Sequence, residues 1–117
     1  MQIEYCAFQI FYSIINGFFR ATRHNKIEIV KYLLKQNVDA DAKNINNQTA
    51  LHNACFKGAH EIVKLLLDHG VIYDSKNLDG DKPAHLAVKG KHIKLFFSKL
   101  QFICFKKLPN LVDKITF

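Results

Sequence analysis

The stretch Thr49-Ala50-Leu51-His52, followed nine residues later by Glu61-Ile62-Val63-Lys64-Leu65-Leu66-Leu67 and then by Gly70, decides the fold of this chain. The Thr49 hydroxyl can accept a hydrogen bond from a free amide at the start of a short helix that begins at Ala50. In the second part, the apolar side chains fall on one broad helix face, which predicts a helix buried on that side. Gly70 can adopt the left-handed conformation that ends such a helix.

The same pattern occurs 33 residues upstream. When residues 11–43 are laid over 44–76, ten of the 33 positions are identical. Ordinary residue frequencies would give roughly two identities by chance. The identical residues are Ala21, Glu28, Ile29, Val30, Lys31, Leu33, Leu34, Val38, Asp41 and Lys43. Identities at a fixed spacing indicate an internal repeat.

A third, weaker copy follows downstream. Pro83-Ala84-His85-Leu86-Ala87 matches Ala50-Leu51-His52-Asn53-Ala54, although Lys82 stands where the second copy has its capping threonine. Ahead of these helices, Asn46-Asn47 and Asp79-Gly80 are dipeptides typical of tight turns, because Asn and Gly accept positive φ at low cost.

A period of 33 residues with this content resembles the ankyrin repeat, a turn followed by two antiparallel helices. The resemblance implies an all-α fold, an ankyrin-repeat solenoid of stacked helix-turn-helix units with β-turn fingers. It covers residues 16–100, about two and a half repeats. We divide this region into a partial repeat 1 at 16–43, repeat 2 at 44–76 and a degenerate repeat 3 at 77–100.

The two ends of the chain match no repeat. Residues 1–15 overlap an uncharged, largely apolar stretch from Tyr5 to Phe19, which is too short to span a bilayer. We expect an N-terminal capping helix packed on repeat 1; a signal or anchor segment and an incorrectly assigned start are the alternatives. Residues 101–117 are expected to form a tail or a second capping helix. Because both ends are apolar, self-association and a longer stack of repeats also stay open.

The chain is basic, with 17 Lys and Arg against 10 Asp and Glu and a net charge of +7. Between Lys82 and Val112 there are seven lysines and no acidic residue. Such a surface attracts nucleic acid, anionic membrane or an acidic patch on a protein, but repeat surfaces are also charged for solubility. Neither a groove-reading helix nor interleaved stacking aromatics accompany these lysines, so the sequence does not favour nucleic acid as the partner.

Residues able to catalyse a reaction or bind a metal ion lack the neighbours that such chemistry needs. Cys6, Cys55 and Cys104 form no Cys-x-x-Cys pair, which argues against a zinc ribbon. Because the cysteines are odd in number and far apart, we expect a reducing, cytoplasmic environment. Cys55 lies one helical turn from His52, but no oxyanion hole accompanies the pair. Glycine-rich phosphate loops do not occur either. We therefore expect no enzyme activity, no cofactor and no metal site.

The resemblance also implies roles for individual positions. In ankyrin proteins, the histidine at the position of His52 and His85 ties neighbouring turns together. Partners of these proteins lie across the turn tips and the short inner helices, which form one concave face. By position, the resemblance implies that this face comprises Ile45, Asn46 and Gln48 at one tip, Leu78, Asp79 and Asp81 at the next, Arg23, His24, Phe56, Lys57, Lys89 and Gly90 at the ends of the inner helices, and Lys43 and Lys76 beside them.

Three interpretations of function compete. The first is a non-catalytic protein–protein interaction module, an adaptor or scaffold that includes the case of a host-directed effector, with Ile45, Phe56 and Leu78 as apolar anchors on the concave face. The alternative is a basic module that associates with nucleic acid or anionic membrane through residues 82–107. Binding that falls steeply with salt would favour this alternative. The third is a degraded remnant of a repeat protein.

Overall fold

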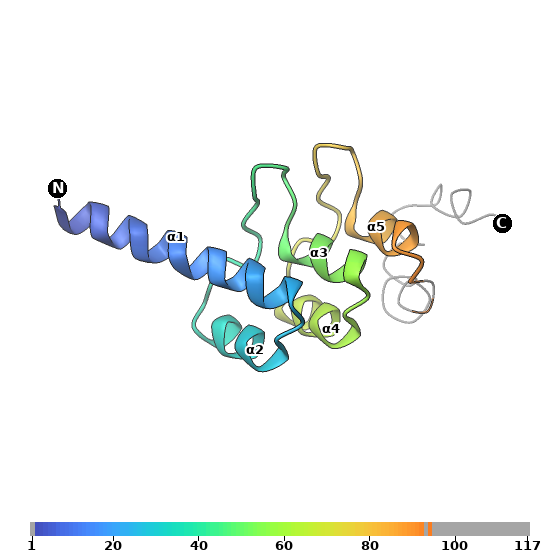
Figure 1. Cartoon of the computed structure of the whole chain (residues 1–117), viewed down its shortest axis with the longest axis horizontal. Helices are drawn as coiled ribbons and strands as arrows, with labels where there is room; N and C mark the ends of the chain where they lie inside the picture. Colours follow the sequence, from blue (N-terminus) through green and yellow to red (C-terminus); the bar gives the residue numbers. More distant parts are fainter. Residues whose placement is uncertain (1, 93, 95–117) are drawn as a thin grey trace.

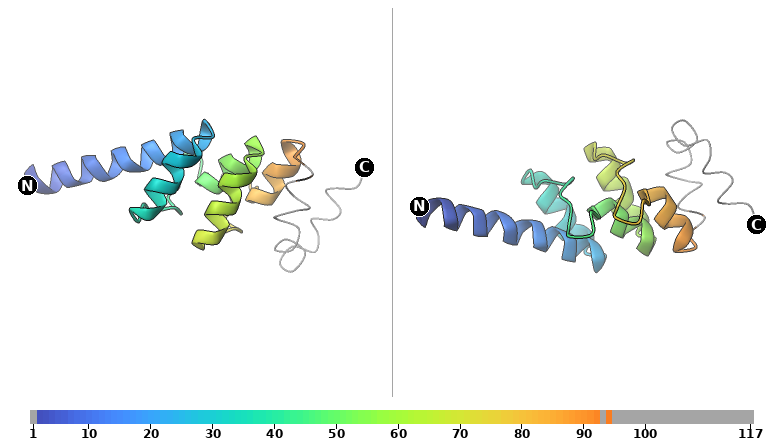
Figure 2. Two further views of the ribbon diagram at one scale, coloured as in Figure 1. Left: turned by 90° about the horizontal axis from the view of Figure 1, so that it is seen from below. Right: turned by 90° about the horizontal axis from the view of Figure 1, so that it is seen from above.

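The computed structural model describes residues 2–92 and 94, and the side chains of residues 12–92 and 94. This part of the chain contains five helices and no strand, as expected for an all-α repeat fold: α1 (Gln2–Arg23), α2 (Ile27–Lys35), α3 (Ala50–Lys57), α4 (His60–His69) and α5 (Pro83–Lys89). The inner helices α1, α3 and α5 form one layer, and the outer helices α2 and α4 form the other (Figures 1 and 2). Two long loops, which we call finger 1 (36–49) and finger 2 (70–82), project on the same side (Figure 1).

The backbone repeats with the same period as the sequence. All positive φ angles of the described residues fall in three sets of positions 33 residues apart: Asn25, Gly58 and Lys91; Asn37 and Gly70; Asn47 and Gly80. The first set follows an inner helix, the second follows an outer helix, and the third lies in a finger. A residue in the left-handed conformation turns the chain sharply, and Asn and Gly reach this conformation most easily. The repeat is therefore present in the backbone conformation as well as in the sequence.

The helix ends confirm the predicted start and stop signals. Thr49 is extended, and its Oγ1 accepts a hydrogen bond from the His52 N–H at 3.4 Å. In return, His52 Nδ1 accepts one from the Thr49 N–H at 3.1 Å, which completes a capping box. The cap of α5 is weaker because Lys82 has no side-chain acceptor; only His85 Nδ1 accepts the Lys82 N–H, at 3.0 Å. At the other end of repeat 2, α4 stops at Gly70 with a φ of 90°.

The core lies between the two layers. Helix α3 packs against α1, α4 and α5, and α2 packs against α4. The predicted apolar face of α4 is buried, while Lys64 and Asp68 are exposed on its other side. The buried residues of the two central helices are Ala50, Leu51, His52, Ala54 and Cys55 of α3 and Ile62, Val63 and Leu66 of α4. Burying each large aliphatic side chain contributes about 1.5–3 kcal/mol, so these two helices contribute substantially to the stability of the fold.

Helix α1 differs from the boundary that the sequence suggested. It runs from Gln2 to Arg23 without a break, so residues 2–15 are not a separate helix but the continuation of the inner helix of repeat 1. Gly17 does not interrupt it. The amino-terminal part of α1 extends beyond the other helices (Figures 1 and 2). What this part packs against stays a prediction, since the side chains of residues 1–11 lie outside the described residues. The expected tail or helix at 101–117 lies outside them entirely.

Candidate functional site

Each finger is closed by one asparagine. Asn44 Oδ1 accepts hydrogen bonds from the backbone N–H groups two and four residues later, at 2.9 and 3.0 Å. Asn77 Oδ1 does the same in finger 2, with both distances 2.9 Å. In both fingers the asparagine N–H also donates to the carbonyl oxygen four residues later, at 3.0 Å. The two tips therefore have the same conformation, fixed by a side chain that mimics a backbone turn.

The two fingers are joined at their tips. The Leu78 N–H donates a hydrogen bond to the Asn46 carbonyl oxygen at 3.0 Å. The two fingers are neighbours (Figure 1), and this bond links the positions beside Ile45 and Leu78, which are equivalent in the two repeats. Ile45 is 91% exposed and Leu78 is 66% exposed. Large apolar side chains that an ordered backbone holds in water are typical of interface anchors.

His52 connects repeat 2 to the base of finger 2. Its Nδ1 accepts from Thr49, so Nε2 carries the proton and donates to the Asp81 carbonyl oxygen at 3.0 Å. Burial of the ring lowers the pKa of His52 below its ordinary value of 6.5, against the raising effect of the Asp81 and Ser75 backbone carbonyls. The neutral ring therefore ties neighbouring turns together, which confirms the structural role predicted for this histidine.

A recess lies between finger 2 and the inner helices α3 and α5. Its volume is about 330 Å³, and it is lined by Gln48, Asn53, Phe56, Asn77, Asp79, Asp81, Leu86 and Lys89. Phe56 is 49% exposed, and Asn53 lies one turn before it on α3. The Lys89 ammonium donates to Asp81 Oδ2, and this hydrogen bond raises the pKa of Lys89. The recess thus has an aromatic wall and several polar groups.

Most of the residues predicted for the concave face are accessible, in separate groups. Ile45, Asn46, Leu78 and Asp79 are exposed at the two tips. The recess brings together Gln48, Phe56, Asp79, Asp81 and Lys89. Arg23, His24 and Lys57 are exposed at or just after the ends of α1 and α3, and Gly90 is half-buried after α5. Lys43 and Lys76 both line another hollow of about 210 Å³, together with Thr49 and Ser75.

Asp81 differs from the prediction of an exposed tip residue. It is only 5% exposed, and its carboxylate is bound to Lys89 eight residues later. Its backbone N–H and carbonyl groups bond to Asn77, and the carbonyl oxygen also accepts from His52. Asp81 therefore holds the base of finger 2 on α5. Its side chain does not offer a partner a free charge.

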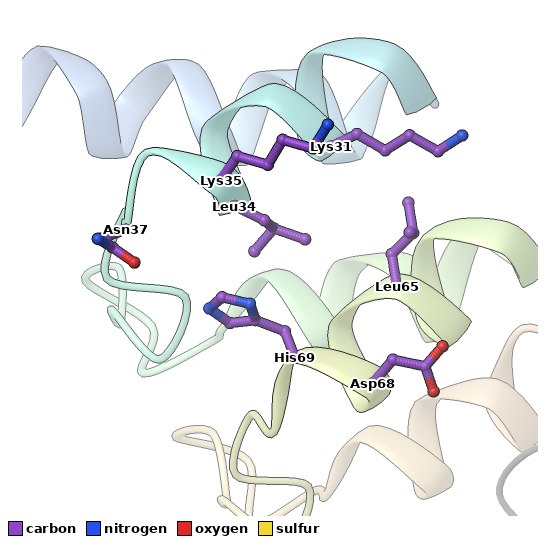
Figure 3. A pocket seen from close by; sticks show the side chains of 7 residues that line it. All are labelled: Lys31, Leu34, Lys35, Asn37, Leu65, Asp68 and His69. Atoms are coloured by element: carbon purple, nitrogen blue, oxygen red, sulfur yellow. The ribbon is translucent and has the colours of Figure 1, made fainter.

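Another hollow lies between the outer helices α2 and α4. It has a volume of about 520 Å³ and is lined by Lys31, Leu34, Lys35, Asn37, Leu65, Asp68 and His69. Leu34 of α2 and Leu65 of α4 point into the gap from opposite sides (Figure 3). The charged side chains around these leucines have both signs, so they select no particular class of ligand.

Sequence reasoning missed three residues of this face. Asn44 and Asn77 set the conformation of the tips, and their identity at a spacing of 33 residues was a usable signal. Asn53 lines the recess with a buried side-chain nitrogen that has no hydrogen-bond partner among the described residues. No sequence pattern marked Asn53, because the other repeats carry different residues at its position.

The described residues contain no group of three or more His, Cys, Asp or Glu side chains placed to hold a metal ion. In this same part of the chain, no helix combines the length and the apolar content that a membrane crossing requires. Cys55 is fully buried in α3, where it fills a small-residue position in the core.

The comparison with known protein families agrees with this geometry. The model for ankyrin repeats (3 copies) matches residues 18–101, close to the predicted 16–100 and more than half of the 117-residue chain. None of the curated proteins matches the chain. Ankyrin repeats are generally protein–protein interaction modules. This match agrees with the 33-residue period, the stacked helix pairs and the paired fingers. The chain therefore belongs to the ankyrin repeat family.

Proposed function

We propose that this chain is a non-catalytic adaptor or scaffold that binds a protein partner across its finger tips and inner helices. The observation that carries the proposal is the pair of apolar tips, Ile45 and Leu78, held together by the hydrogen bond from the Leu78 N–H to Asn46. Exposed apolar side chains on a backbone fixed before binding lose little conformational entropy in a complex. Phe56, further down on α3, extends this apolar surface toward the recess.

The burial of Cys55 and the odd number of cysteines agree with a reducing, cytoplasmic setting, which we include in the proposal. The alternative, in which residues 82–107 associate with nucleic acid or anionic membrane through their positive charge, has less support. Of its lysines, Lys89 is bound to Asp81 and so contributes little free charge, whereas Lys91 and Lys94 are exposed.

The test is a quantitative binding measurement with a partner captured by the wild-type chain. Ile45→Ser and Leu78→Ser should each weaken the binding of this partner by about 1 kcal/mol or more, roughly fivefold in Kd, because they remove apolar anchors. Ile72→Ser is the matched control, since Ile72 is a half-exposed isoleucine away from the tips. It should leave the affinity unchanged. The melting temperatures of all three variants should stay close to the wild type.

A charge variant separates the two interpretations. Replacing Lys91 and Lys94 by Gln should change mainly the association rate and its dependence on salt. If this double variant abolishes binding while Ile45→Ser and Leu78→Ser have no effect, the finger tips are not the site, and the basic half of the chain is.

A further inference from the structure

The recess beside finger 2 contains a feature that the apolar tips do not explain. Asn53 Nδ2 is closed off from solvent and has no hydrogen-bond partner among the described residues. A buried donor without an acceptor is costly, and folded proteins contain few of them. Asn53 as a residue is only partly buried and lines the open volume of about 330 Å³, so a ligand there can supply the acceptor once the amide turns toward the recess.

The charges of the recess indicate what kind of group it takes. Two carboxylates and one ammonium line it, those of Asp79, Asp81 and Lys89, which leaves a net charge of −1. Lys89 is bound to Asp81 and is also attracted by Asp79 at longer range, but the ion pairs of the described residues do not include Asp79. In a chain with a net charge of +7, this is a locally acidic place. Charge complementarity therefore selects a cationic group.

The shape and the aromatic wall narrow the choice further. Phe56 presents a half-exposed ring to the same recess, and a cation is attracted to the face of such a ring. A planar guanidinium stacks on an aromatic ring and can donate two hydrogen bonds to one carboxylate, which an ammonium cannot do in the same way. The volume is at the small end of ligand pockets, which suits one long side chain.

The equivalent place beside finger 1 has the opposite character. There, Arg20 and Arg23 occupy the positions of Asn53 and Phe56. Neutral amides, Asn46 and Gln48, replace the two aspartates. Each of these differences disfavours a cation. The acidic, aromatic recess is therefore a property of finger 2 and not of the repeat pattern.

We propose that this recess binds an arginine side chain from an extended segment of the partner protein. The guanidinium lies on the ring of Phe56 and is held by the Asp79 carboxylate. The Asn53 amide turns toward the recess, and a main-chain carbonyl of the same segment accepts the hydrogen bond from its Nδ2, since a guanidinium has no acceptor to offer. The inference rests on the proposed function and deepens it by naming the chemistry of the partner.

The test uses the full chain and four pools of fluorescently labelled nonapeptides. Each pool has random flanks and one fixed central residue: Arg, Lys, Leu or Glu. Fluorescence anisotropy should give the lowest Kd for the Arg pool, followed by Lys, with Leu and Glu weakest. The Arg pool should bind about tenfold more tightly than the Glu pool, because a charge-assisted hydrogen bond replaces a repulsion. Any order in which Arg is not first overturns the proposal.

Variants locate the binding. Asp79→Asn and Phe56→Leu should each raise the Kd of the Arg pool by about fivefold to tenfold. Asp68→Asn is the matched control, since it removes the same charge from an exposed position on α4 outside the recess. It should leave the Kd unchanged. Equal losses in Asp79→Asn and Asp68→Asn would show unspecific attraction and overturn the assignment. Unchanged melting temperatures would show that the variants are folded.

The role of Asn53 has its own readout. In NMR spectra with N-acetyl-arginine methylamide, the side-chain NH₂ signals of Asn53 should shift as the ligand carbonyl binds. Those signals can be assigned by their loss in Asn53→Leu. N-acetyl-norleucine methylamide should cause no such shift. Shifts of the Phe56 ring signals without any change at Asn53 would overturn the carbonyl contact.

These measurements do not involve the natural partner, so the two proposals can fail separately. If arginine is not preferred while Ile45→Ser and Leu78→Ser still weaken the partner, the recess assignment fails and the proposed function stands. If arginine is preferred but those two variants leave the partner's affinity intact, the recess stands and the role of the tips fails.

Discussion

Ile29 on α2 and Ile62 on α4 occupy the same position in successive repeats, within the identical sequences Glu28-Ile29-Val30-Lys31 and Glu61-Ile62-Val63-Lys64. Ile29 is nevertheless 51% exposed, while Ile62 is 0% exposed. One residue further, the two valines are both fully buried. The valine is buried in both repeats. The isoleucine is buried only on α4, the outer helix against which a preceding outer helix, α2, packs. Burial in this fold is therefore supplied by the neighbouring repeat as much as by the helix itself.

The largest predicted effect tests this difference directly. Ile62→Ala should destabilise the chain by about 2–5 kcal/mol, because it removes a fully buried side chain and leaves a cavity. Ile29→Ala should cost less than about 1 kcal/mol, since half of that side chain is already in water. Urea unfolding followed by circular dichroism measures both. The helix propensity change is the same in the two variants, so it cancels in the comparison. Equal losses at the two positions would contradict the stacking argument.

The junction between repeat 2 and finger 2 should depend on His52. His52→Ala removes a buried ring together with its bonds to Thr49 and Asp81, so it should destabilise the chain by about 2 kcal/mol. Thermal unfolding measures this loss. Partner affinity, corrected for the folded fraction, should stay at the wild-type value; a selective loss of affinity would show that His52 contacts the partner.

The same histidine predicts a pH dependence of stability. Burial holds the pKa of His52 in the fold below 6.5, so the unfolded chain takes up the proton first as the pH falls. The stability contributed by the neutral ring is complete above pH 6.5. It decreases as the pH falls from 6.5 toward the lowered pKa of the folded state. In urea unfolding between pH 7.5 and 5, His52→Gln should show a smaller decrease than the wild type. Parallel curves would exclude this linkage.

The two fingers, unlike the two outer helices, should respond alike. Asn44→Ala and Asn77→Ala each remove a carbonyl that accepts two backbone N–H bonds, at a cost of about 1 kcal/mol. Thermal unfolding of the two variants is the measurement. The expected result is a similar loss in both, because the tip geometry is the same. A loss at Asn77 alone would mean that the bonds of finger 1, where Asn44 is less buried than Asn77, contribute nothing.

The smallest predicted effect concerns repeat 3. Lys91 has a φ of 65° where repeat 2 has Gly58. A long side chain in the left-handed region is strained, so Lys91→Gly should stabilise the chain by about 0.5–1 kcal/mol. Lys94→Gly, at an exposed helical residue, is the control and should not stabilise. A melting temperature that falls in Lys91→Gly would show that the Lys91 side chain makes a contact worth more than the strain.

The sequence predicted the local features of the fold well. The start of α3, the exit at Gly70, the turn dipeptides and the buried face of α4 all depend on residues close together in the chain. The exposure of Ile45, Phe56 and Leu78 also agrees with the prediction. Their part in binding stays a prediction, because exposure alone does not identify a partner.

Two features were misplaced, each for a different reason. The similarity between repeats ends near residue 16, but α1 continues upstream, since a helix needs a breaking signal to stop and Gly17 is too weak a signal. Asp81 was expected at the surface because its backbone lies in a finger. Its side chain turns toward α5 and binds Lys89, and no repeat pattern fixes such a direction. The acidic recess was missed for the same reason.

The hydrogen bond from the Leu78 N–H to the Asn46 carbonyl has a consequence for how this surface can change over evolution or by design. The bond joins main-chain atoms of the two fingers, and the side chains of Asn44 and Asn77 close the fingers on either side of it. None of these contacts uses the side chains at 45 and 78. The chain can therefore vary what it presents at the two tips while keeping their spacing and its own fold. Positions 45 and 78 are the natural places to randomise in selecting variants with new partners.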